Sequence, residues 1–259
     1  MAFSGCFNPS CCNDSSSWPL HAHGTSRTVE CYNYSDPSYC LWCFWCRGKN
    51  SRQLFTILTL TTLQGAYAIK LAKLSNIHPI IAVAGRGAAF VESLIDRKKG
   101  DTIVDYRNGD SAVVTGIQEA LKKAGTKEVK YAFDAVSEHN SFQNISQVLS
   151  KHGSKITLVL PGTDFSAIPN HIEKSTTMVG SVHMDPSEGK AKAGIITGGK
   201  EFGYVFFRLF SRGLQQGWFS GHPHEVVPGG LNGVEKGLAN LKEGVNSATK
   251  YVFKIEDTK

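Results

Sequence analysis

Short apolar-rich runs separated by helical patterns constrain the fold of this chain more than any other sequence feature. The runs lie at Pro79–Ala84, Thr102–Val104, Val129–Phe133 and Lys155–Leu160. Runs of this kind are typical of strands that are buried on both faces of a parallel sheet. Helical patterns fill the intervals, at Gly65–Ser75, Ala88–Asp96, Ala112–Lys123 and Phe142–Leu149. The alternation predicts βαβ units with right-handed crossovers, and therefore an α/β fold with a doubly wound parallel sheet.

The remainder of the chain predicts four more elements. We expect a sixth strand at Thr177–His183 and a closing strand at Lys250–Ile255. Helical patterns cover Phe202–Gly217 and Leu231–Glu243. Between the sixth strand and the first of these helices, Met184–Lys200 is polar and glycine-rich, which indicates a flexible loop.

Composition divides the chain between about residues 50 and 65. All seven cysteines lie between Cys6 and Cys46, and three of the four tryptophans precede residue 50. Hydrophobic residues make up 41% of the chain, which is enough for a packed core. We therefore expect residues 1–53 to be an unstructured or aberrant segment, with that character continuing to about residue 64. Residues 54–259 are expected to form the α/β domain.

Charge and hydropathy argue against two classes of partner. The net charge is +6, and no run of five basic residues occurs, which argues against nucleic-acid binding. No apolar stretch reaches the roughly eighteen residues that a membrane span needs. The amino terminus has no basic region followed by an apolar core, so a secretory signal is not expected. We expect a cytoplasmic protein with no nucleic-acid or membrane partner.

Small and polar residues follow the predicted strands at their carboxyl ends, where open α/β sheets bind ligands. Ala84-Gly85-Arg86-Gly87 follows the second strand. Proteins that bind NAD usually carry an acid there to hold the ribose hydroxyls, whereas a guanidinium suits the 2′-phosphate of NADP. Arg86 therefore predicts NADPH, and the alternative is a surface arginine in a turn. Similar segments follow the next strands, at Asp105–Arg107, Asp134–Ser137 and Leu160–Gly162.

These segments together resemble the zinc-independent medium-chain dehydrogenase/reductases, in their quinone oxidoreductase and enoyl reductase branches. The likeness is carried by GAYAIKLAKL (Gly65–Leu74), DTIVDYR (Asp101–Arg107), YAFDAVS (Tyr131–Ser137), KITLVLPG (Lys155–Gly162) and KYVFKI (Lys250–Ile255). The resemblance implies a Rossmann-type NADPH-binding domain that transfers hydride to an activated alkene or carbonyl. It implies a small-molecule substrate of enoyl, enone or quinone type, and a second copy or a polyketide-pathway protein as partner.

The resemblance also implies where the cofactor lies. From the adenosine end to the nicotinamide end, the implied cofactor-binding residues are Gly85, Arg86 and Tyr106, then Gly65 and Ala66, then Asp134, Ala135 and Val136, and last Leu160, Pro161, Val182 and His183. No catalytic residue can be assigned, and no metal site is expected in this branch.

Two features depart from the family. Thr59–Gln64 stands where the family has a glycine-rich loop whose amides bind the pyrophosphate, and it contains no glycine. The residues before it do not resemble the family's GroES-like substrate domain. We therefore expect a degraded first strand and phosphate loop, a missing substrate domain, and a fragment that does not turn over. Leu54–Leu60 is apolar enough to occupy the first strand position by chance.

A shifted reading frame accounts for both departures. The codons of Tyr39–Cys46, read one base later, permit IVYGASGA, a first strand that enters a glycine-rich loop. Both glycines are fixed, because Trp42 and Trp45 each have a single codon that is followed by a codon beginning with T. Splice signals are also permitted: a GTAAG donor at Gly48-Lys49, a CTAAC branch point at Leu58-Thr59 and a CAG acceptor at Gln64. Our hypothesis is that residues 1–48 are read out of frame and residues 49–64 are a retained intron.

The alternative function is a non-catalytic binding module with a cysteine-rich, metal-binding head. Cys40, Cys43 and Cys46 are spaced by two residues. Zinc sites usually add a second cysteine pair or histidines at a defined spacing, and His21 and His23 fit neither pattern. We therefore favour the reductase and assign no metal ligands.

Overall fold

The computed structural model describes residues 19–20, 27–28, 55–58, 63–126, 129–183, 195–196 and 199–259. The chain divides into two compact units, residues 1–49 and 50–259. In the first unit, β1 (Pro19–Leu20) pairs antiparallel with β2 (Arg27–Thr28). Every element described below belongs to the second unit.

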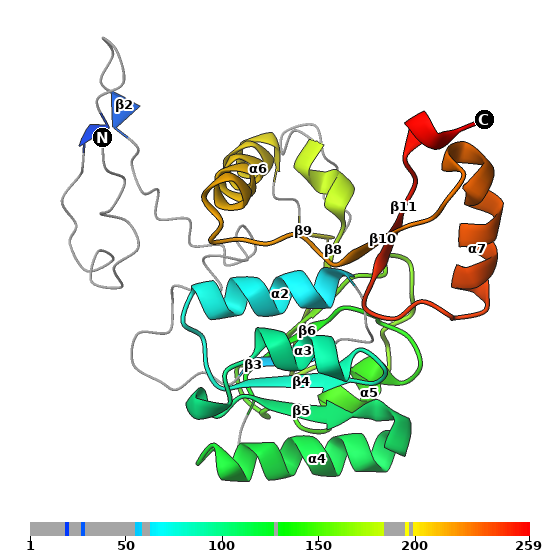
Figure 1. Ribbon diagram of the computed structural model, residues 1–259. Helices are drawn as coiled ribbons and strands as arrows, with labels where there is room; N and C mark the ends of the chain where they lie inside the picture. The colour runs from blue at the N-terminus through cyan, green and yellow to red at the C-terminus, as the bar shows by residue number, and fades with distance from the viewer. Residues whose placement is uncertain are drawn as a thin grey trace. The chain divides into compact units, whose positions relative to one another are not determined.

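A parallel sheet of seven strands lies at the centre of the second unit (Figure 1). The strands are β3 (Phe55–Leu58), β4 (Ile80–Ala84), β5 (Thr102–Asp105), β6 (Tyr131–Asp134), β7 (Lys155–Leu158), β8 (Glu173–Thr177) and β9 (Ile195–Ile196). Their order in the sheet is β5-β4-β3-β6-β7-β8-β9, and each neighbouring pair is parallel. Because the chain winds outward in both directions from β3, the predicted doubly wound sheet is confirmed. β3 occupies the first strand position, within the segment expected to do so.

Helices cover both faces of this sheet. Those on the sheet are α2 (Leu63–Leu74), α3 (Ala88–Leu94), α4 (Asp110–Lys123) and α5 (Ser141–Ser146), whereas α6 (Gly199–Gln216) packs on residues 179–183 and α7 (Val234–Lys242) on residues 230–233. Figure 1 shows α2 and α3 over one face and α4 and α5 over the other. The buried side chains of α4 recur at helical spacing, at Val113, Ile117, Ala120 and Leu121. α4 also packs closely on β5, since a Cβ at Gly116 would lie 2.8 Å from Val104 Cγ1.

The core is densest at the centre of the sheet. All five residues of β4 are buried, as expected for a strand with helices on both faces. Ile81 and Val83 belong to a cluster that continues through Ile117 of α4 and Ile156 of β7. Burying each such side chain contributes about 1.5–3 kcal/mol. This core fixes the strands, and therefore the loops that follow them.

The predicted sixth strand is wrong in position. β8 ends at Thr177, where that strand was expected to begin, and Val179–His183 form the 3-10 helix η5. The reason is packing: a Cβ at Gly203 of α6 would lie 2.9 Å from Val182 Cβ, so the helix backbone lies directly on η5. Of the expected loop Met184–Lys200, residues 184–194 and 197–198 lie outside the described residues, Ile195–Ile196 form β9, and α6 begins at Gly199.

The predicted closing strand is shorter than expected and does not join the large sheet. β11 (Lys250–Val252) pairs in parallel with β10 (His224–Val226) in a separate two-stranded sheet. The chain leaves β11 at Phe253, whose ring packs on α7, since a Cβ at Gly237 would lie 2.7 Å from it. The helix expected at Leu231–Glu243 is divided into a 3-10 helix, η6 (Gly230–Gly233), and α7.

A buried lysine joins α2 to the segment that follows α6. Lys70 Nζ donates to the carbonyl oxygen and hydroxyl of Ser220 at 2.9 and 3.0 Å, and to the carbonyl oxygen of Gly221 at 2.9 Å. The rings of Tyr67 and Phe219 stack beside it, with centroids 5.8 Å apart. Burial lowers the pKa of Lys70. The contact holds the carboxyl-terminal elements against the sheet-covering helix α2.

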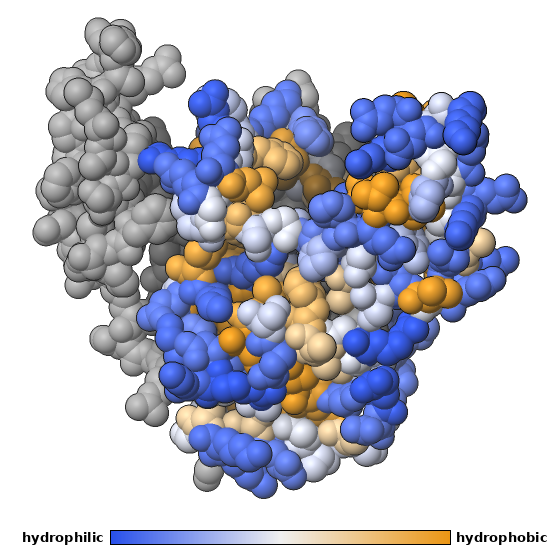
Figure 2. Space-filling model, viewed as in Figure 1, coloured by the Kyte–Doolittle hydropathy of each residue, from blue (hydrophilic) through white to orange (hydrophobic). Residues whose placement is uncertain are grey.

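Apolar side chains remain exposed on α6 and α7. Figure 2 shows such residues among polar ones at the positions that these two helices have in Figure 1. They include Tyr204, Val205, Phe207 and Leu214 of α6 and Leu238 and Leu241 of α7. Within the described part of the chain, no helix combines the length and hydropathy needed to cross a membrane.

Candidate functional site

The residues predicted to bind a cofactor all follow carboxyl ends of neighbouring strands. Tyr106 follows β5, Arg86 follows β4, and Gly65 lies in the first turn of α2 after β3. Asp134 ends β6, and Leu160 follows β7. Since these strands are adjacent and parallel in the order β5-β4-β3-β6-β7, one edge of the sheet carries the residues in the order in which an extended ligand would meet them.

Gly85 and Tyr106 are in direct contact at this edge. β4 and β5 are paired up to Ala84 and Asp105, so the next residue of each strand lies beside the other. A Cβ at Gly85 would lie 2.4 Å from Cε1 of the Tyr106 ring, which real side chains do not approach. The ring therefore rests on the glycine backbone, and a side chain at residue 85 would require the ring to move.

Arg86 is the exposed cation at the same corner. Its Nη1 donates to the carbonyl oxygen of Gly244 at 2.6 Å. Arg107 is engaged differently, since its guanidinium donates to the carboxylate of Asp105. These hydrogen bonds lower the pKa of Asp105. Among the ion pairs of the described residues, none involves Arg86. Among the described residues, no carboxylate neutralises the charge of Arg86, whereas Asp105 neutralises that of Arg107.

Asp134 uses its carboxylate to shape the loop after β6. The residue is 0% exposed. One oxygen accepts the backbone N–H groups of Val136 and Ser137 at 3.0 and 2.9 Å, and the other accepts the hydroxyl of Ser141 at 2.5 Å. Burial raises the pKa of Asp134, although these hydrogen bonds act in the opposite direction. The carboxylate therefore points into the protein, and the backbone of the loop after β6, rather than the Asp134 side chain, faces the edge of the sheet.

Ser137 joins that loop to the next strand end. Its φ is +58°, and its hydroxyl accepts the backbone N–H of Val159 at 3.1 Å. Ser137 could not be singled out from the sequence, because a serine after a strand carries no distinctive signal. Together Asp134 and Ser137 fix the loops after β6 and β7 relative to each other.

The residues expected near the nicotinamide are mainly apolar. Leu160 is 37% exposed and Pro161 is exposed beside it. Val182 is half-buried beneath α6, and His183 is exposed at the end of η5. His183 was expected on a strand, and it lies on a 3-10 helix instead. Ala135 is buried and Val136 half-buried, so this side of the edge offers shape and apolar surface.

The start of α2 is described, but the segment before it is not. Gly65 and Ala66 are buried in the first turn of the helix. Residues 59–62, where the phosphate loop was expected to be degraded, lie outside the described residues. The predicted role of Gly65 and Ala66 beside a pyrophosphate stays a prediction.

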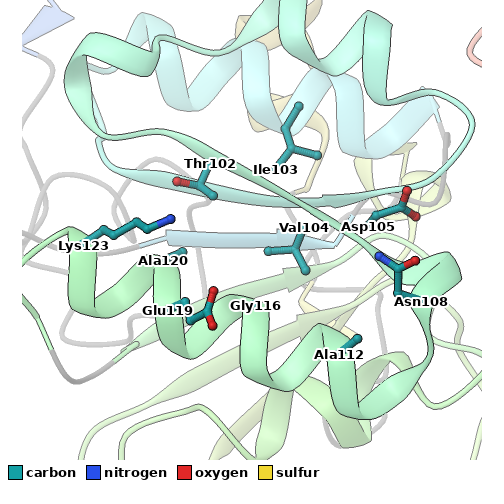
Figure 3. Close-up of a pocket in the computed structure, with 10 residues that line it drawn as sticks. All are labelled: Thr102, Ile103, Val104, Asp105, Asn108, Ala112, Gly116, Glu119, Ala120 and Lys123. Atoms are coloured by element: carbon teal, nitrogen blue, oxygen red, sulfur yellow. The ribbon is translucent and has the colours of Figure 1, made fainter.

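A hollow of about 250 Å³ lies elsewhere, between β5 and α4 (Figure 3). Its lining includes Thr102 and Val104 of the strand and Ala112, Gly116 and Glu119 of the helix. None of the predicted cofactor-binding residues lines it. It follows the outer edge of the sheet, so we do not place the cofactor there.

No metal centre occurs in the described part of the chain, where no three His, Cys, Asp or Glu residues gather closely enough to hold an ion. The cysteine-rich segment, including Cys40, Cys43 and Cys46, lies outside the described residues.

Curated relatives of the chain are reductases. A trans-enoyl reductase of Gibberella fujikuroi is 48% identical over 169 residues, which cover 65% of this chain and 45% of that relative. A trans-enoyl reductase of Gibberella zeae is 25% identical over 200 residues, covering 75% and 52%. The chain spans about half the length of the curated relatives it matches. No protein-family model matches it.

Known structures share the fold. CurA from Vibrio vulnificus, in complex with NADPH, superposes with a TM-score of 0.51 and 17% identity over 77% of this chain and 56% of that chain. The mitochondrial 2-enoyl thioester reductase heterodimer Etr1p/Etr2p of Candida tropicalis gives 0.52 and 19% over 74% and 52%. Sequence relationship and fold agree: the chain is similar in sequence to trans-enoyl reductases over about half of their length, and it shares its Rossmann-type fold with enoyl reductases of known structure.

Proposed function

We propose that this chain is the NADPH-binding part of a trans-enoyl reductase, which reduces the activated double bond of a small enoyl substrate. The observation that carries the proposal is the corner formed by β4 and β5. There Arg86, a cation that pairs with no carboxylate among the described residues, replaces the acid that favours NAD, and it stands beside a tyrosine ring packed on Gly85.

The residues present fit NADPH, because they offer complementary groups in the order that the cofactor requires. Arg86 would hold the 2′-phosphate, with Tyr106 alongside the adenosine. The loop fixed by Asp134 and Ser137 would orient the middle of the cofactor. Leu160 and Val182 would exclude water near the nicotinamide. When bound, NADPH supplies the hydride, and the chain supplies position and surroundings.

The test of cofactor binding is a fluorescence titration of the full chain with NADPH and NADH. Arg86→Ala is expected to weaken NADPH binding about tenfold or more and to leave NADH binding unchanged, because it removes a charge-assisted contact to the 2′-phosphate. Arg107→Ala is the matched control, since its guanidinium is already held by Asp105. Stoichiometric zinc in a chain that binds neither nucleotide would instead favour the non-catalytic module.

We further propose that residues 1–64 do not belong to the reductase frame. The shifted reading frame supports this, because it permits a glycine-rich loop before Gly65. The confinement of all seven cysteines to residues 6–46 supports it as well. The consequence is that the pyrophosphate subsite is incomplete in this chain, so NADPH binding should be weak and turnover absent.

Sequencing the mature transcript across the codons for Tyr39–Lys70 tests this second proposal. Absence of the codons for residues 49–64, together with the last two bases of the Gly48 codon, would support it and predict an intact loop of sequence GASGAV before Gly65. Their presence in the mature transcript would contradict it.

A further inference from the structure

The carboxyl end of α7 lies against the corner that we assign to the 2′-phosphate. Arg86 and Gly244 are separated by 158 residues in sequence, yet the guanidinium donates to the Gly244 carbonyl oxygen at 2.6 Å. The Arg86 side chain also lies near the Gly244 backbone, since a Cβ at Gly244 would be 3.4 Å from Arg86 Nη2.

The geometry of this helix end favours a cation. The N–H of Gly244 donates to the Leu241 carbonyl, the N–H of Val245 donates to the Asn240 carbonyl, and Gly244 has a φ of +66°. This is the left-handed turn that commonly ends a helix. Because carbonyl groups at a helix carboxyl end carry partial negative charge, the guanidinium is stabilised where it lies.

The contact also leaves most of the guanidinium available. Arginine has five N–H donors, and the hydrogen bond to Gly244 uses one of them. An arginine that is held in place before its ligand arrives loses less side-chain freedom when the ligand binds. A carbonyl oxygen holds the side chain without neutralising its charge, whereas a carboxylate such as Asp105, which holds Arg107, would neutralise it.

We propose that the carboxyl-terminal turn of α7, centred on Gly244, positions Arg86 for recognition of the adenosine 2′-phosphate. Gly244 is then a positioning residue that determines the preference for a 2′-phosphorylated nucleotide, although it need not touch the nucleotide. This inference rests on the proposed function, and it assigns a specificity role to the carboxyl-terminal elements β10, α7 and β11.

The test measures binding of two probes that differ only in the 2′-phosphate, adenosine 2′,5′-bisphosphate and adenosine 5′-monophosphate. Calorimetry on the full chain gives the ratio of the two dissociation constants. Gly244→Ala introduces a Cβ at a positive φ, which strains the turn that holds the Arg86 guanidinium, and the new Cβ would lie 3.4 Å from Arg86 Nη2. We expect the preference for the bisphosphate to fall about threefold to tenfold, with monophosphate binding unchanged.

The chain offers a matched control at Gly125. That glycine ends α4 in the same way, with a φ of +71° and its N–H donating to the Lys122 carbonyl. A Cβ there would meet nothing within 4 Å. Gly125→Ala therefore carries a similar backbone cost without touching Arg86, and it should leave the preference intact. Arg86→Ala should abolish the preference, and adding Gly244→Ala to it should change nothing further.

Each outcome separates the inference from the function on which it rests. If Gly244→Ala keeps the full preference while Arg86→Ala loses it, Gly244 does not position Arg86 and the proposed function stands. If Gly125→Ala reduces the preference as much as Gly244→Ala, the effect is general destabilisation and the inference fails. If the parent chain shows no preference for the bisphosphate, the proposed 2′-phosphate site and this inference are both overturned.

Discussion

On the β4–β5 side of the sheet edge, the polar side chains face outward, whereas on the β6–β7 side they face inward. Arg86 is exposed, and within the described part of the chain its guanidinium donates to a carbonyl oxygen and pairs with no carboxylate. Asp134 is fully buried, and each of its hydrogen bonds holds its own loop. On the second side, the groups left exposed are apolar ones such as Leu160.

At one edge of the sheet, exposed side chains can therefore serve ligand recognition on one side, while buried side chains fix the loops on the other. An exposed side chain such as Arg86 contributes little to folding, so its chemistry can match a ligand group, which suits the proposed contact with the adenosine 2′-phosphate. A loop held by a buried acid presents a fixed shape, which suits a flat, largely uncharged ring. Substitution of Arg86 should therefore change selectivity with little change in stability, and substitution of the buried acid should do the reverse.

Asp134→Ala is expected to have the largest effect. It leaves the N–H groups of Val136 and Ser137 and the hydroxyl of Ser141 without their acceptor. The free energy of unfolding should fall by about 3 kcal/mol, since buried donors that lose a partner cost roughly 1–3 kcal/mol each and some will find water. Urea unfolding measures this, with Asp105→Ala as the control at a neighbouring strand end. If Asp134→Ala and the parent chain unfold at the same urea concentration, the Asp134 hydrogen bonds do not stabilise the fold.

The pH dependence of the same residue gives a second measurement. Burial raises the pKa of Asp134 in the folded chain. The stability it contributes is therefore fully present below the unfolded pKa and declines as pH rises through the folded pKa. The difference in unfolding free energy between the parent and Asp134→Asn should be largest in acid and should narrow as pH rises. A difference that widens with pH would contradict the direction of the shift.

Gly85→Ala, on the β4–β5 side of the sheet edge, is expected to have an intermediate effect on the free energy of unfolding. The new Cβ would meet the Tyr106 ring, whose nearest atom lies at 2.4 Å. Overpacking of this kind costs about 1–3 kcal/mol, and moving the ring should also weaken NADPH binding. Thermal unfolding of Gly85→Ala, alone and combined with Tyr106→Ala, measures the cause. The substitution should cost much less once the ring is removed, and an equal cost in both backgrounds would show that the ring is not responsible.

Leu160→Ser is expected to have the smallest effect. The side chain is 37% exposed, so the free energy of unfolding should change by less than about 0.5 kcal/mol. If Leu160 lines the nicotinamide end, the dissociation constant for NADPH should rise about threefold, while that for adenosine 2′,5′-bisphosphate stays unchanged. If Leu160→Ser weakens the binding of NADPH and of adenosine 2′,5′-bisphosphate equally, Leu160 does not line the nicotinamide end, and the two sides of the sheet edge do not differ as proposed.

The sequence predicted those elements whose local pattern and final environment agree. Ile80–Ala84 is a continuous apolar run and becomes a buried strand. The apolar spacing of α4 places Val113 and Ile117 on its buried face. Arg86 could be singled out because its position after a strand, and the absence of an acid there, are both local facts. β8 has the polar sequence EKSTT and gives no such pattern. The strand was therefore expected at Thr177–His183, where η5 lies.

Features that depend on distant packing could not be predicted. The contact between Arg86 and Gly244 joins residues 158 apart. Lys70 has the sequence pattern of an ordinary helical lysine, yet it is bound by the backbone of Ser220 and Gly221. β11 falls within the strand expected at Lys250–Ile255, but its partner β10 (His224–Val226) lies more than twenty residues earlier in the chain and was not expected.

Hydrogen–deuterium exchange with and without NADPH tests the central claim most directly, because it locates the nucleotide on the sheet. We expect slower exchange of backbone amides at residues 85–87, 106–109, 135–137 and 159–162, and unchanged exchange at the opposite ends of β4 and β5, near residues 78–80 and 100–102. Slower exchange confined to α4 and the outer edge of β5, around the hollow of Figure 3, would contradict it.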